Sequence, residues 1–270
     1  MTKHYLISGA NSGIGRALAE DLAGRGHRVF ATAPTEETLE SLKGVTENII
    51  PLLLDLRNPA HLAAAEETVK THTTHLDGLI NNAGIGLFGP VELLDMNGVK
   101  NNFEINVYGH LAMTQRFLPL LRKAGGARIV FTSSVAGLLS QPLGSCYAAT
   151  KFALNAFCDG LRMELKPEGI SVSVVMPGRI KTPLWQTTDT HYLDDHPLMG
   201  PYTQRVSRFK KMVRASEKAA APVEKVTRVM RRALFSRWPR AKYLVGTDAR
   251  VISWLRWLPT FLVDRLIMRL

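Results

Sequence analysis

The sequence predicts an α/β fold built on a doubly wound parallel sheet with helices on both faces. Apolar runs of strand length alternate with amphipathic segments of helix length, and a glycine-rich turn joins the first strand to the first helix. Continuous runs of Val, Ile and Leu are typical of strands that are buried on both faces, as in parallel sheets. Right-handed crossovers then place a ligand site at the carboxyl ends of the strands. The strand-like runs are residues 5–8, 28–33, 49–54, 79–82, 128–132 and 170–176.

Length and composition suit a single domain spanning residues 1–270, large enough for a sizeable core. Apolar residues make up 46% of the chain, but they form no run long enough for a transmembrane helix. The N-terminus enters a strand at once, so we expect no secretory signal. Cys146 and Cys158 are predicted to lie on or beside one helix, about 18 Å apart at a rise of ~1.5 Å per residue, which is too far for a disulfide. We therefore expect reduced thiols in a cytoplasmic protein.

Positive charge is concentrated in the last quarter of the chain. The net charge is +11, yet residues 201–270 hold 17 basic and 4 acidic residues, a balance of +13, whereas residues 1–200 have a balance of −2. Such a segment is a solvated basic face, a contact for an anionic membrane, or a site for a phosphorylated or carboxylated partner. We find no recognition motif for nucleic acid and predict no nucleic-acid partner and no metal ligands.

The stretch from Tyr147 to Lys151 is the first candidate for catalysis. The two residues are four apart, so on a helix they lie one above the other. An ammonium beside a phenol favours the phenolate, so a tyrosine with an ordinary pKa near ~10 becomes a usable acid/base at neutral pH. A hydroxyl from elsewhere could hold a carbonyl or alcohol oxygen against the phenol. Taken alone, the pattern is also common on solvated helices.

The N-terminal strand runs into a glycine turn and then into a helical pattern that begins near Arg16. Gly9, Gly13 and Gly15 have the spacing Gly-x-x-x-Gly-x-Gly. Glycines allow the backbone to approach a ligand closely, and free N–H groups at a helix start can receive a pyrophosphate. Without the rest of the chain, an ordinary glycine-rich turn would explain this segment equally well.

Further signatures follow in sequence order and establish a resemblance. They are Asp55-Leu56, Asn81-Asn82-Ala83-Gly84, Asn106 in a helical stretch, Ser134 thirteen residues before Tyr147, and the segment 177–182 after the strand 170–176. With these, the chain resembles the short-chain dehydrogenase/reductase family, in its short-subunit branch, over roughly residues 3–182. The resemblance implies a Rossmann-type sheet of about seven strands, with the seventh around residues 243–245, and an NAD(P)-dependent oxidoreductase.

The resemblance also implies catalytic roles. Tyr147 matches the residue that transfers the substrate proton, and Lys151 matches the lysine that lowers the tyrosine's pKa and binds the nicotinamide ribose. Ser134 matches the serine that orients the substrate oxygen; the neighbouring Ser133 is the rival. Asn106 matches an asparagine in a distorted helix whose carbonyl holds a water in a proton relay to the lysine.

The cofactor site implied by the resemblance extends from the glycine turn to the segment after residue 176. It consists of Gly9, Asn11, Ser12, Gly13, Ile14 and Gly15 at the glycine turn, Thr32 at the end of the second strand, Asp55 and Leu56 at the adenine, Asn82, Ala83 and Gly84 at the adenosine ribose, Tyr147 and Lys151 at the nicotinamide ribose, and Pro177, Gly178, Ile180 and Thr182 at the carboxamide.

The choice of coenzyme depends on the end of the second strand. NAD-selective members carry an acid there, which accepts a hydrogen bond from the ribose 2′-hydroxyl. Here the position falls within Thr32-Ala33-Pro34, without an acid, and the nearest base is Arg16. Because no carboxylate repels a 2′-phosphate, we predict NADP, with NAD as the alternative.

The predicted reaction interconverts an alcohol and a ketone or aldehyde. The stretches 147–163 and 167–173 look most like the steroid, retinoid and hydroxybutyrate dehydrogenase group. A mobile substrate lid is predicted at residues 183–222. Apolar side chains suited to a bulky substrate, or to packing the lid, are Trp185, Tyr192, Leu193, Leu198, Met199, Tyr202, Phe209 and Met212, together with Leu138, Leu139, Pro142 and Leu143. The alternatives are an epimerase or dehydratase, and a catalytically weak dinucleotide-sensing or membrane-associated interaction protein.

Two further expectations concern assembly. The helical stretches 103–121 and 147–165 carry apolar residues on more than one side, and in the family such helices pair across a two-fold axis, so we expect a homodimer or homotetramer. The tail at residues 247–270 consists of two apolar, arginine-punctuated segments separated by Pro259. It either lies in a membrane interface or packs on the lid or a partner subunit.

Overall fold

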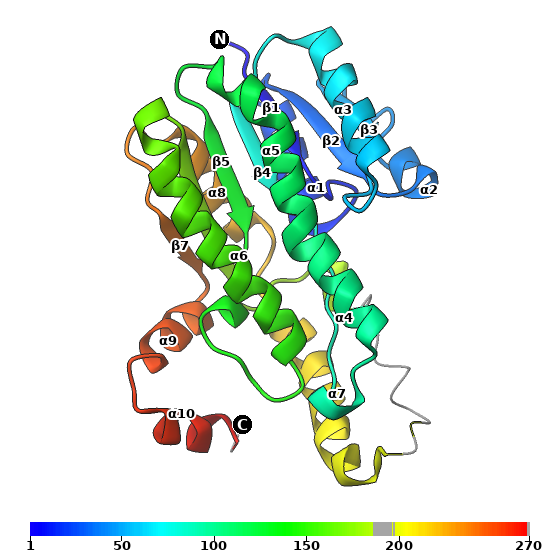
Figure 1. Ribbon diagram of the computed structural model, residues 1–270, viewed down its shortest axis with the longest axis vertical. Helices are drawn as coiled ribbons and strands as arrows, with labels where there is room; N and C mark the ends of the chain where they lie inside the picture. Colours follow the sequence, from blue (N-terminus) through cyan, green and yellow to red (C-terminus); the bar gives the residue numbers. More distant parts are fainter. Residues whose placement is uncertain (186–195, 197, 269–270) are drawn as a thin grey trace.

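The computed structural model in Figure 1 describes residues 1–185, 196 and 198–268. Its sheet has seven parallel strands in the order β3-β2-β1-β4-β5-β6-β7. The strands are β1 (His4–Ile7), β2 (Arg28–Ala33), β3 (Ile49–Leu53), β4 (Gly78–Asn81), β5 (Arg128–Thr132), β6 (Ser171–Pro177) and β7 (Lys242–Val245). The predicted doubly wound fold and its seventh strand are confirmed. The strand order reverses between β1 and β4, which is where such sheets bind their ligands.

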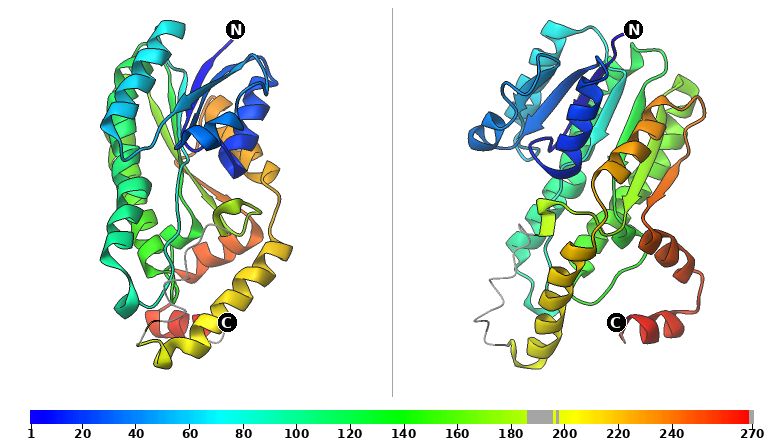
Figure 2. Two further views of the ribbon diagram at one scale, coloured as in Figure 1. Left: turned by 90° about the vertical axis from the view of Figure 1, so that its right-hand side faces the viewer. Right: turned by 180° about the vertical axis from the view of Figure 1, so that it is seen from behind.

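Helices cover both faces of this sheet, as Figures 1 and 2 show. The helices and helical turns are α1 (Gly13–Ala23), α2 (Glu36–Glu40), α3 (Pro59–His72), η1 (Val91–Leu93), α4 (Met96–Phe103), η2 (Glu104–Tyr108), α5 (Gly109–Arg122), η3 (Val135–Gly137), α6 (Ser145–Glu164), η4 (Lys166–Glu168), η5 (Pro183–Trp185), η7 (Gly200–Tyr202), α7 (Thr203–Ala219), α8 (Glu224–Phe235), α9 (Thr247–Leu255) and α10 (Thr260–Ile267). Helices α3, α5 and α6 pack on one face, and α1 and α8 on the other.

Along each strand, successive side chains pack alternately into the two hydrophobic cores, one on each face of the sheet. Leu6 of β1 belongs to the core beneath α3, α5 and α6, whereas its neighbours Tyr5 and Ile7 belong to the core beneath α1 and α8. Because strand side chains alternate between faces, a strand that must fill both cores has apolar residues at every position. This is why the sequence shows continuous apolar runs.

The segment predicted as a lid is partly described. Residue Ile180 bridges to Ala221, and α7 packs inward through Val206 and Phe209. Of the apolar residues predicted to face a substrate, Tyr192, Leu193 and the side chain of Trp185 lie outside the described residues.

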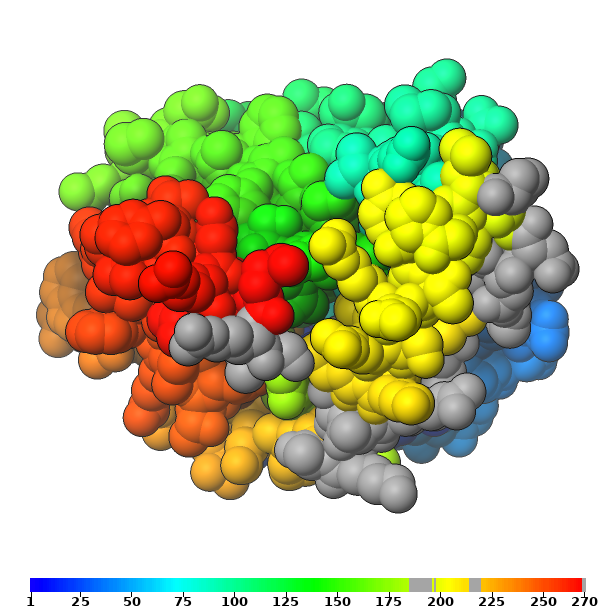
Figure 3. Space-filling view, turned by 90° about the horizontal axis from the view of Figure 1, so that it is seen from below, coloured from blue at the N-terminus to red at the C-terminus, as the bar shows by residue number. Residues whose placement is uncertain are grey.

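The C-terminal tail forms two short helices, α9 and α10, with the interruption predicted at Pro259. Figure 3 shows the two helices on the same face of the molecule as α7. Most of their large apolar side chains are exposed. Among the described residues, every helix is too short or too polar to traverse a lipid bilayer.

Candidate active site

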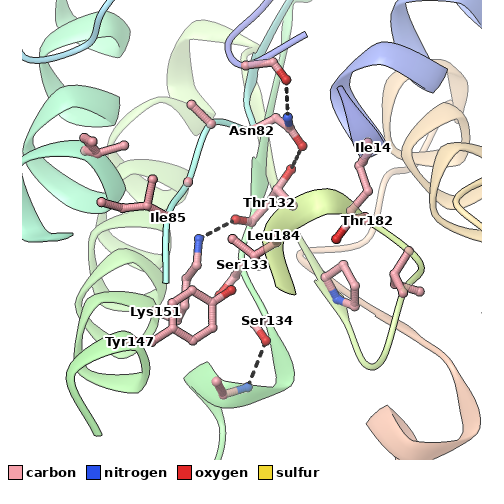
Figure 4. Close-up of a pocket in the computed structure, with 18 of the residues that line it drawn as sticks. Ile14, Asn82, Ile85, Thr132, Ser133, Ser134, Tyr147, Lys151, Thr182 and Leu184 are labelled. Atoms are coloured by element: carbon pink, nitrogen blue, oxygen red, sulfur yellow. Dashed lines mark hydrogen bonds between the residues drawn. The ribbon is translucent and has the colours of Figure 1, made fainter. Parts of the chain in front are cut away.

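A cavity of about 670 Å³ lies at the carboxyl ends of the strands. Most of the site residues predicted from the sequence line it: Gly9, Asn11, Ser12, Gly13, Ile14, Asp55, Leu56, Asn82, Ala83, Gly84, Ser134, Tyr147, Lys151, Pro177, Gly178, Ile180 and Thr182. Figure 4 shows Tyr147, Lys151 and Ser134 together on one side of this cavity, with Ile14 and Thr182 across from them. Gly15, Thr32 and Asn106 are not among the lining residues. They contact the segments that line the cavity.

The glycines allow a close approach of backbone segments that side chains would prevent. Gly9 has φ +62°, and a Cβ there would lie 2.8 Å from Ala83 Cα. A Cβ on Gly15 would lie 2.2 Å from the Gly9 carbonyl oxygen, so this glycine allows α1 to approach the turn. Helix α1 begins at Gly13, and its first backbone N–H groups lack intrahelical acceptors. These free N–H groups suit a phosphate-bearing ligand.

Thr32 and Asn82 hold the turn in place. The Thr32 carbonyl accepts from Ala10 N at 2.8 Å, and its hydroxyl accepts from Gly9 N at 3.3 Å. Asn82 Nδ2 donates to the carbonyls of Ser8 and Gly9, both at 3.1 Å. Thr32 is therefore a buried support of the turn in this structure and not a lining residue, because its hydroxyl faces the backbone of the turn.

Lys151 is buried beside Tyr147. Its Nζ lies 5.5 Å from the centroid of the Tyr147 ring and donates to the Thr132 carbonyl at 3.1 Å. The Thr132 hydroxyl in turn donates to Asn82 Oδ1 at 3.0 Å. Hydrogen bonds thus connect the lysine, through β5, to the asparagine that holds the glycine turn.

Burial moves the pKa of both groups toward their neutral forms. Burial raises the pKa of Tyr147 to about 12, while a hydrogen bond with Ser134 acts in the opposite direction. Burial lowers the pKa of Lys151 to about 8. The sequence argument expected Lys151 to lower the pKa of Tyr147, but burial outweighs this effect here and the net shift of the Tyr147 pKa is upward. The four-residue spacing indicated that Tyr147 and Lys151 are close together, but it could not indicate that both groups are removed from water.

The hydrogen bond with Tyr147 distinguishes Ser134 from Ser133. Ser134 follows β5, caps η3 by accepting from Ala136 N at 3.2 Å, and contacts the Tyr147 phenol. Ser133 is 3% exposed, and its hydroxyl has no hydrogen-bond partner within the described part of the chain. Geometry thus places Ser134 beside the phenol, in agreement with the thirteen-residue spacing.

Asn106 lies in the π-helical turn η2, between α4 and α5. A π turn interrupts the regular i→i−4 hydrogen bonding of a helix. Asn106 Nδ2 donates to Ile85 O at 2.9 Å and to Thr150 Oγ1 at 3.1 Å, and its Oδ1 accepts from Ile85 N at 2.9 Å. The side chain therefore fixes the segment after Gly84 against α6 and does not itself line the cavity.

The end of the cavity that Asp55 lines contains a residue that the sequence reasoning missed. Arg57 donates to Asp55 Oδ2 at 2.6 Å and to Asn101 Oδ1 at 3.0 Å, and this hydrogen bonding holds the pKa of Asp55 below its usual value. Both Arg57 and Asp55 line the cavity. Arg16, by contrast, bonds to Glu20 and to the Ser41 carbonyl and is not a lining residue. The sequence could have indicated this ion pair, because Arg57 follows the predicted adenine-binding residue Asp55 by two positions.

The other end of the cavity is largely apolar. The Phe88 ring lies 5.5 Å from the rings of both Tyr147 and Phe209. Among the residues predicted for the lid region, Leu139 and Met212 line the cavity, Met199, Tyr202, Phe209 and Leu143 pack around Phe88, Leu138 joins the core beneath α6, and Leu198 and Pro142 are exposed.

Helix α9 also reaches the cavity, which the sequence did not indicate. Asp248 and Ile252 line it, and Asp248 Oδ2 accepts from Arg179 N at 2.7 Å. The tail therefore begins as part of the cavity wall. The physical reason is that β7 ends at Val245, beside the carboxyl end of β6, so the following helix starts at the cavity edge.

Residues 3–193 match the family model described as short chain dehydrogenase, and the chain belongs to this family. It is 35% identical to human retinol dehydrogenase 16 over 97% of this chain and 86% of that protein. It is 34% identical to rat 17-beta-hydroxysteroid dehydrogenase type 6 over 98% of this chain and 87% of that protein. The protein is thus an oxidoreductase of the class acting on CH–OH donors.

Solved structures with the same fold hold either nicotinamide coenzyme. A short-chain dehydrogenase/reductase from Burkholderia phymatum in complex with NAD is similar with a TM-score of 0.82 and 25% identity, over 94% of this chain and 92% of that one. A short-chain dehydrogenase from Burkholderia cenocepacia in complex with NADP gives a TM-score of 0.77 and 25% identity, over 98% and 97%. A nicotinamide dinucleotide is therefore the cofactor class of this protein.

Proposed function

We propose that the protein interconverts a bulky, apolar alcohol and its ketone or aldehyde, with NADP as the preferred coenzyme. The observation that carries this proposal is the grouping of Ser134, Tyr147 and Lys151 on one wall of a cavity whose other end is a glycine cradle. The coenzyme supplies or accepts the hydride at its nicotinamide ring.

The chain's own residues handle the proton. In the direction of reduction, the Tyr147 hydroxyl donates its proton to the carbonyl oxygen, which the Ser134 hydroxyl holds in place. The raised pKa keeps the phenol protonated at neutral pH, so the donor is in its active form. Lys151, whose pKa is lowered to about 8, exchanges a proton near neutral pH and stabilises the phenolate left by the transfer. Asn106 positions this group through Ile85 and Thr150.

The coenzyme preference rests on charge at the adenosine end. No acid occurs in Thr32-Ala33-Pro34, and Pro34 lines the cavity. Arg57 already neutralises Asp55, the carboxylate that lines this end. Pairing of this carboxylate lowers its repulsion of a 2′-phosphate.

The substrate class rests on the apolar end of the cavity. Phe88, Leu139 and Met212 surround the approach to Tyr147, and apolar walls favour a bulky apolar molecule. Two of the similar proteins are named for retinol and for a hydroxysteroid, which supports a retinoid- or steroid-like alcohol.

The tail supports a peripheral contact with a membrane. Trp254, Trp257 and Phe261 are 66%, 75% and 67% exposed, and the Arg256 guanidinium lies 4.7 Å from the centroid of the Trp257 ring. Exposed Trp and Leu beside Arg are typical of helices that lie in the interface of an anionic membrane. Because α9 also lines the cavity, such a contact would deliver a lipid-like substrate to the site. The protein is then cytoplasmic and membrane-peripheral.

Assembly as a homodimer or homotetramer is supported by α6. Phe152, Phe157 and Met163 are 45%, 46% and 62% exposed on this helix, although such side chains are normally buried. A partner subunit that covers them would remove this apolar surface from water.

A coenzyme-coupled screen tests the proposed function. Steroid, retinoid and acyl carbonyl compounds are offered with NADPH or NADH, and loss of the reduced coenzyme is followed spectroscopically. We expect turnover of at least one steroid or retinoid carbonyl, faster with NADPH, and reduced by Ser134→Ala more than by the matched control Ser133→Ala. Coenzyme binding without turnover of any compound would favour the dinucleotide-sensing alternative.

A further inference from the structure

A second group of ionisable side chains lies at the opposite edge of the sheet. His4 is the first residue of β1, and Asp77 directly precedes β4, its neighbour in the sheet. Asp77 N donates to His4 O at 2.9 Å, and His4 N donates to Asp77 Oδ2 at 2.8 Å. His75 lies two residues before Asp77. None of the three lines the cavity, because they occupy the amino ends of the strands.

The three side chains converge on one point. His75 Nε2 lies 3.5 Å from Asp77 Oδ2, and His4 Nδ1 lies 3.9 Å from the same oxygen. One ligand atom from each residue lies within 4.8 Å of the other two. His4 Nδ1 is buried, and no described residue offers it a hydrogen-bond partner. Burying a nitrogen without a hydrogen-bond partner costs the free energy of its solvation by water. A ligand that binds to His4 Nδ1 would recover part of this cost.

The donor set fits a borderline divalent cation. Imidazole nitrogens and a carboxylate oxygen are ligands of Zn²⁺, with bonds of about 2.0–2.2 Å, which places tetrahedral ligand atoms roughly 3.3 Å apart. The distance from His75 Nε2 to Asp77 Oδ2, 3.5 Å, is close to this spacing, and the partly exposed His75 side chain can rotate to meet it. The distance from His4 Nδ1 to the same oxygen, 3.9 Å, is longer, so metal binding also requires a small movement of His4 toward Asp77. A water would complete the fourth position, as it does in zinc sites with three protein ligands.

We propose that His4, His75 and Asp77 bind a divalent cation of the Zn²⁺ type, which ties the start of β1 to the segment before β4. The site is separate from the catalytic cavity, which lies at the other ends of these strands. Arg28 pairs with His4 across β1 and β2 and repels a cation, so moderate affinity is expected.

Zn²⁺ binding to the protein tests this site without coenzyme or substrate. The protein is stripped with a chelator and titrated with Zn²⁺ by calorimetry, and thermal unfolding is recorded with and without the ion. We expect a single site whose occupancy raises Tm. His75→Ala and His4→Gln should abolish both effects, whereas His72→Ala, which removes an exposed histidine outside the group, should retain them.

A direct spectroscopic reading needs no variant. Co²⁺ in place of Zn²⁺ should give visible absorption bands of a low-coordinate nitrogen–oxygen site, and Zn²⁺ should displace them. Absence of binding by the wild-type protein would overturn the proposal. Equal Zn²⁺ binding by wild type and His75→Ala would do the same, since it would assign the metal to other histidines.

Discussion

Lys151→Met tests whether this lysine is buried in the way that its pKa indicates. Lys151 is 3% exposed, and burial lowers the pKa of its ammonium from 10.5 to about 8. Above pH 8 the folded protein releases this proton, while the unfolded chain keeps it until pH 10.5. The unfolded state then binds more protons, so wild-type stability rises with pH across this window. Methionine fills a similar volume without a titratable group.

The expected size follows from the shift. A difference of one pKa unit corresponds to about 1.4 kcal/mol. Between pH 8 and pH 10, the free energy of unfolding of wild type should therefore rise by about 2–3 kcal/mol relative to that of Lys151→Met. The pKa values of Cys146, Cys158 and Tyr147 are raised, and their contributions are present in both proteins and cancel in the difference. Urea unfolding at several pH values measures both proteins. A difference independent of pH would refute the reasoning, because it would mean that Lys151 keeps its ordinary pKa.

Three further predictions follow from the cofactor site and the surface. Pro34→Asp, at the exposed residue of this strand end that lines the cavity, should turn the coenzyme preference toward NADH by more than about tenfold, because a carboxylate ~4 Å from a 2′-phosphate repels it by about 4 kcal/mol at an effective dielectric constant of ~20; a fluorescence titration in which wild type already favours NADH would contradict this. Trp254→Ser combined with Trp257→Ser should abolish salt-sensitive sedimentation with anionic vesicles, while the control Trp238→Ser, at a site 80% exposed, should not; equal pelleting of both would exclude the tail as the contact. Phe157→Glu should reduce the mass measured by light scattering, and a wild type that is already monomeric at micromolar concentration would contradict the proposed assembly.

The strands and the lining residues were accessible from the sequence, because both are determined locally. The apolar runs indicated that the strands are buried on both faces. The glycine spacing indicated that backbone segments approach one another closely at the turn. What each residue does in three dimensions was less accessible. Thr32 was expected to contact the cofactor, yet its hydroxyl supports the Gly9 backbone, since side-chain direction in a strand end depends on the neighbouring turn.

Features that depend on distant segments could not be predicted. Asp248 and Ile252 enter the cavity wall only because β7 ends beside β6. The direction in which the Tyr147 pKa shifts depends on how far the whole fold excludes water from the phenol. His4 and Asp77 are 73 residues apart in sequence, so no local pattern marked them as neighbours.

The central claim is that Tyr147 transfers the substrate proton, and turnover by Tyr147→Phe tests it most directly. Phenylalanine keeps the ring against Phe88 but removes the hydroxyl that contacts Ser134. With any carbonyl substrate found in the screen, we predict that kcat falls to background while coenzyme affinity stays within a few-fold of wild type. A variant that binds coenzyme normally and keeps a substantial part of wild-type kcat would contradict the assignment of Tyr147 as the proton donor.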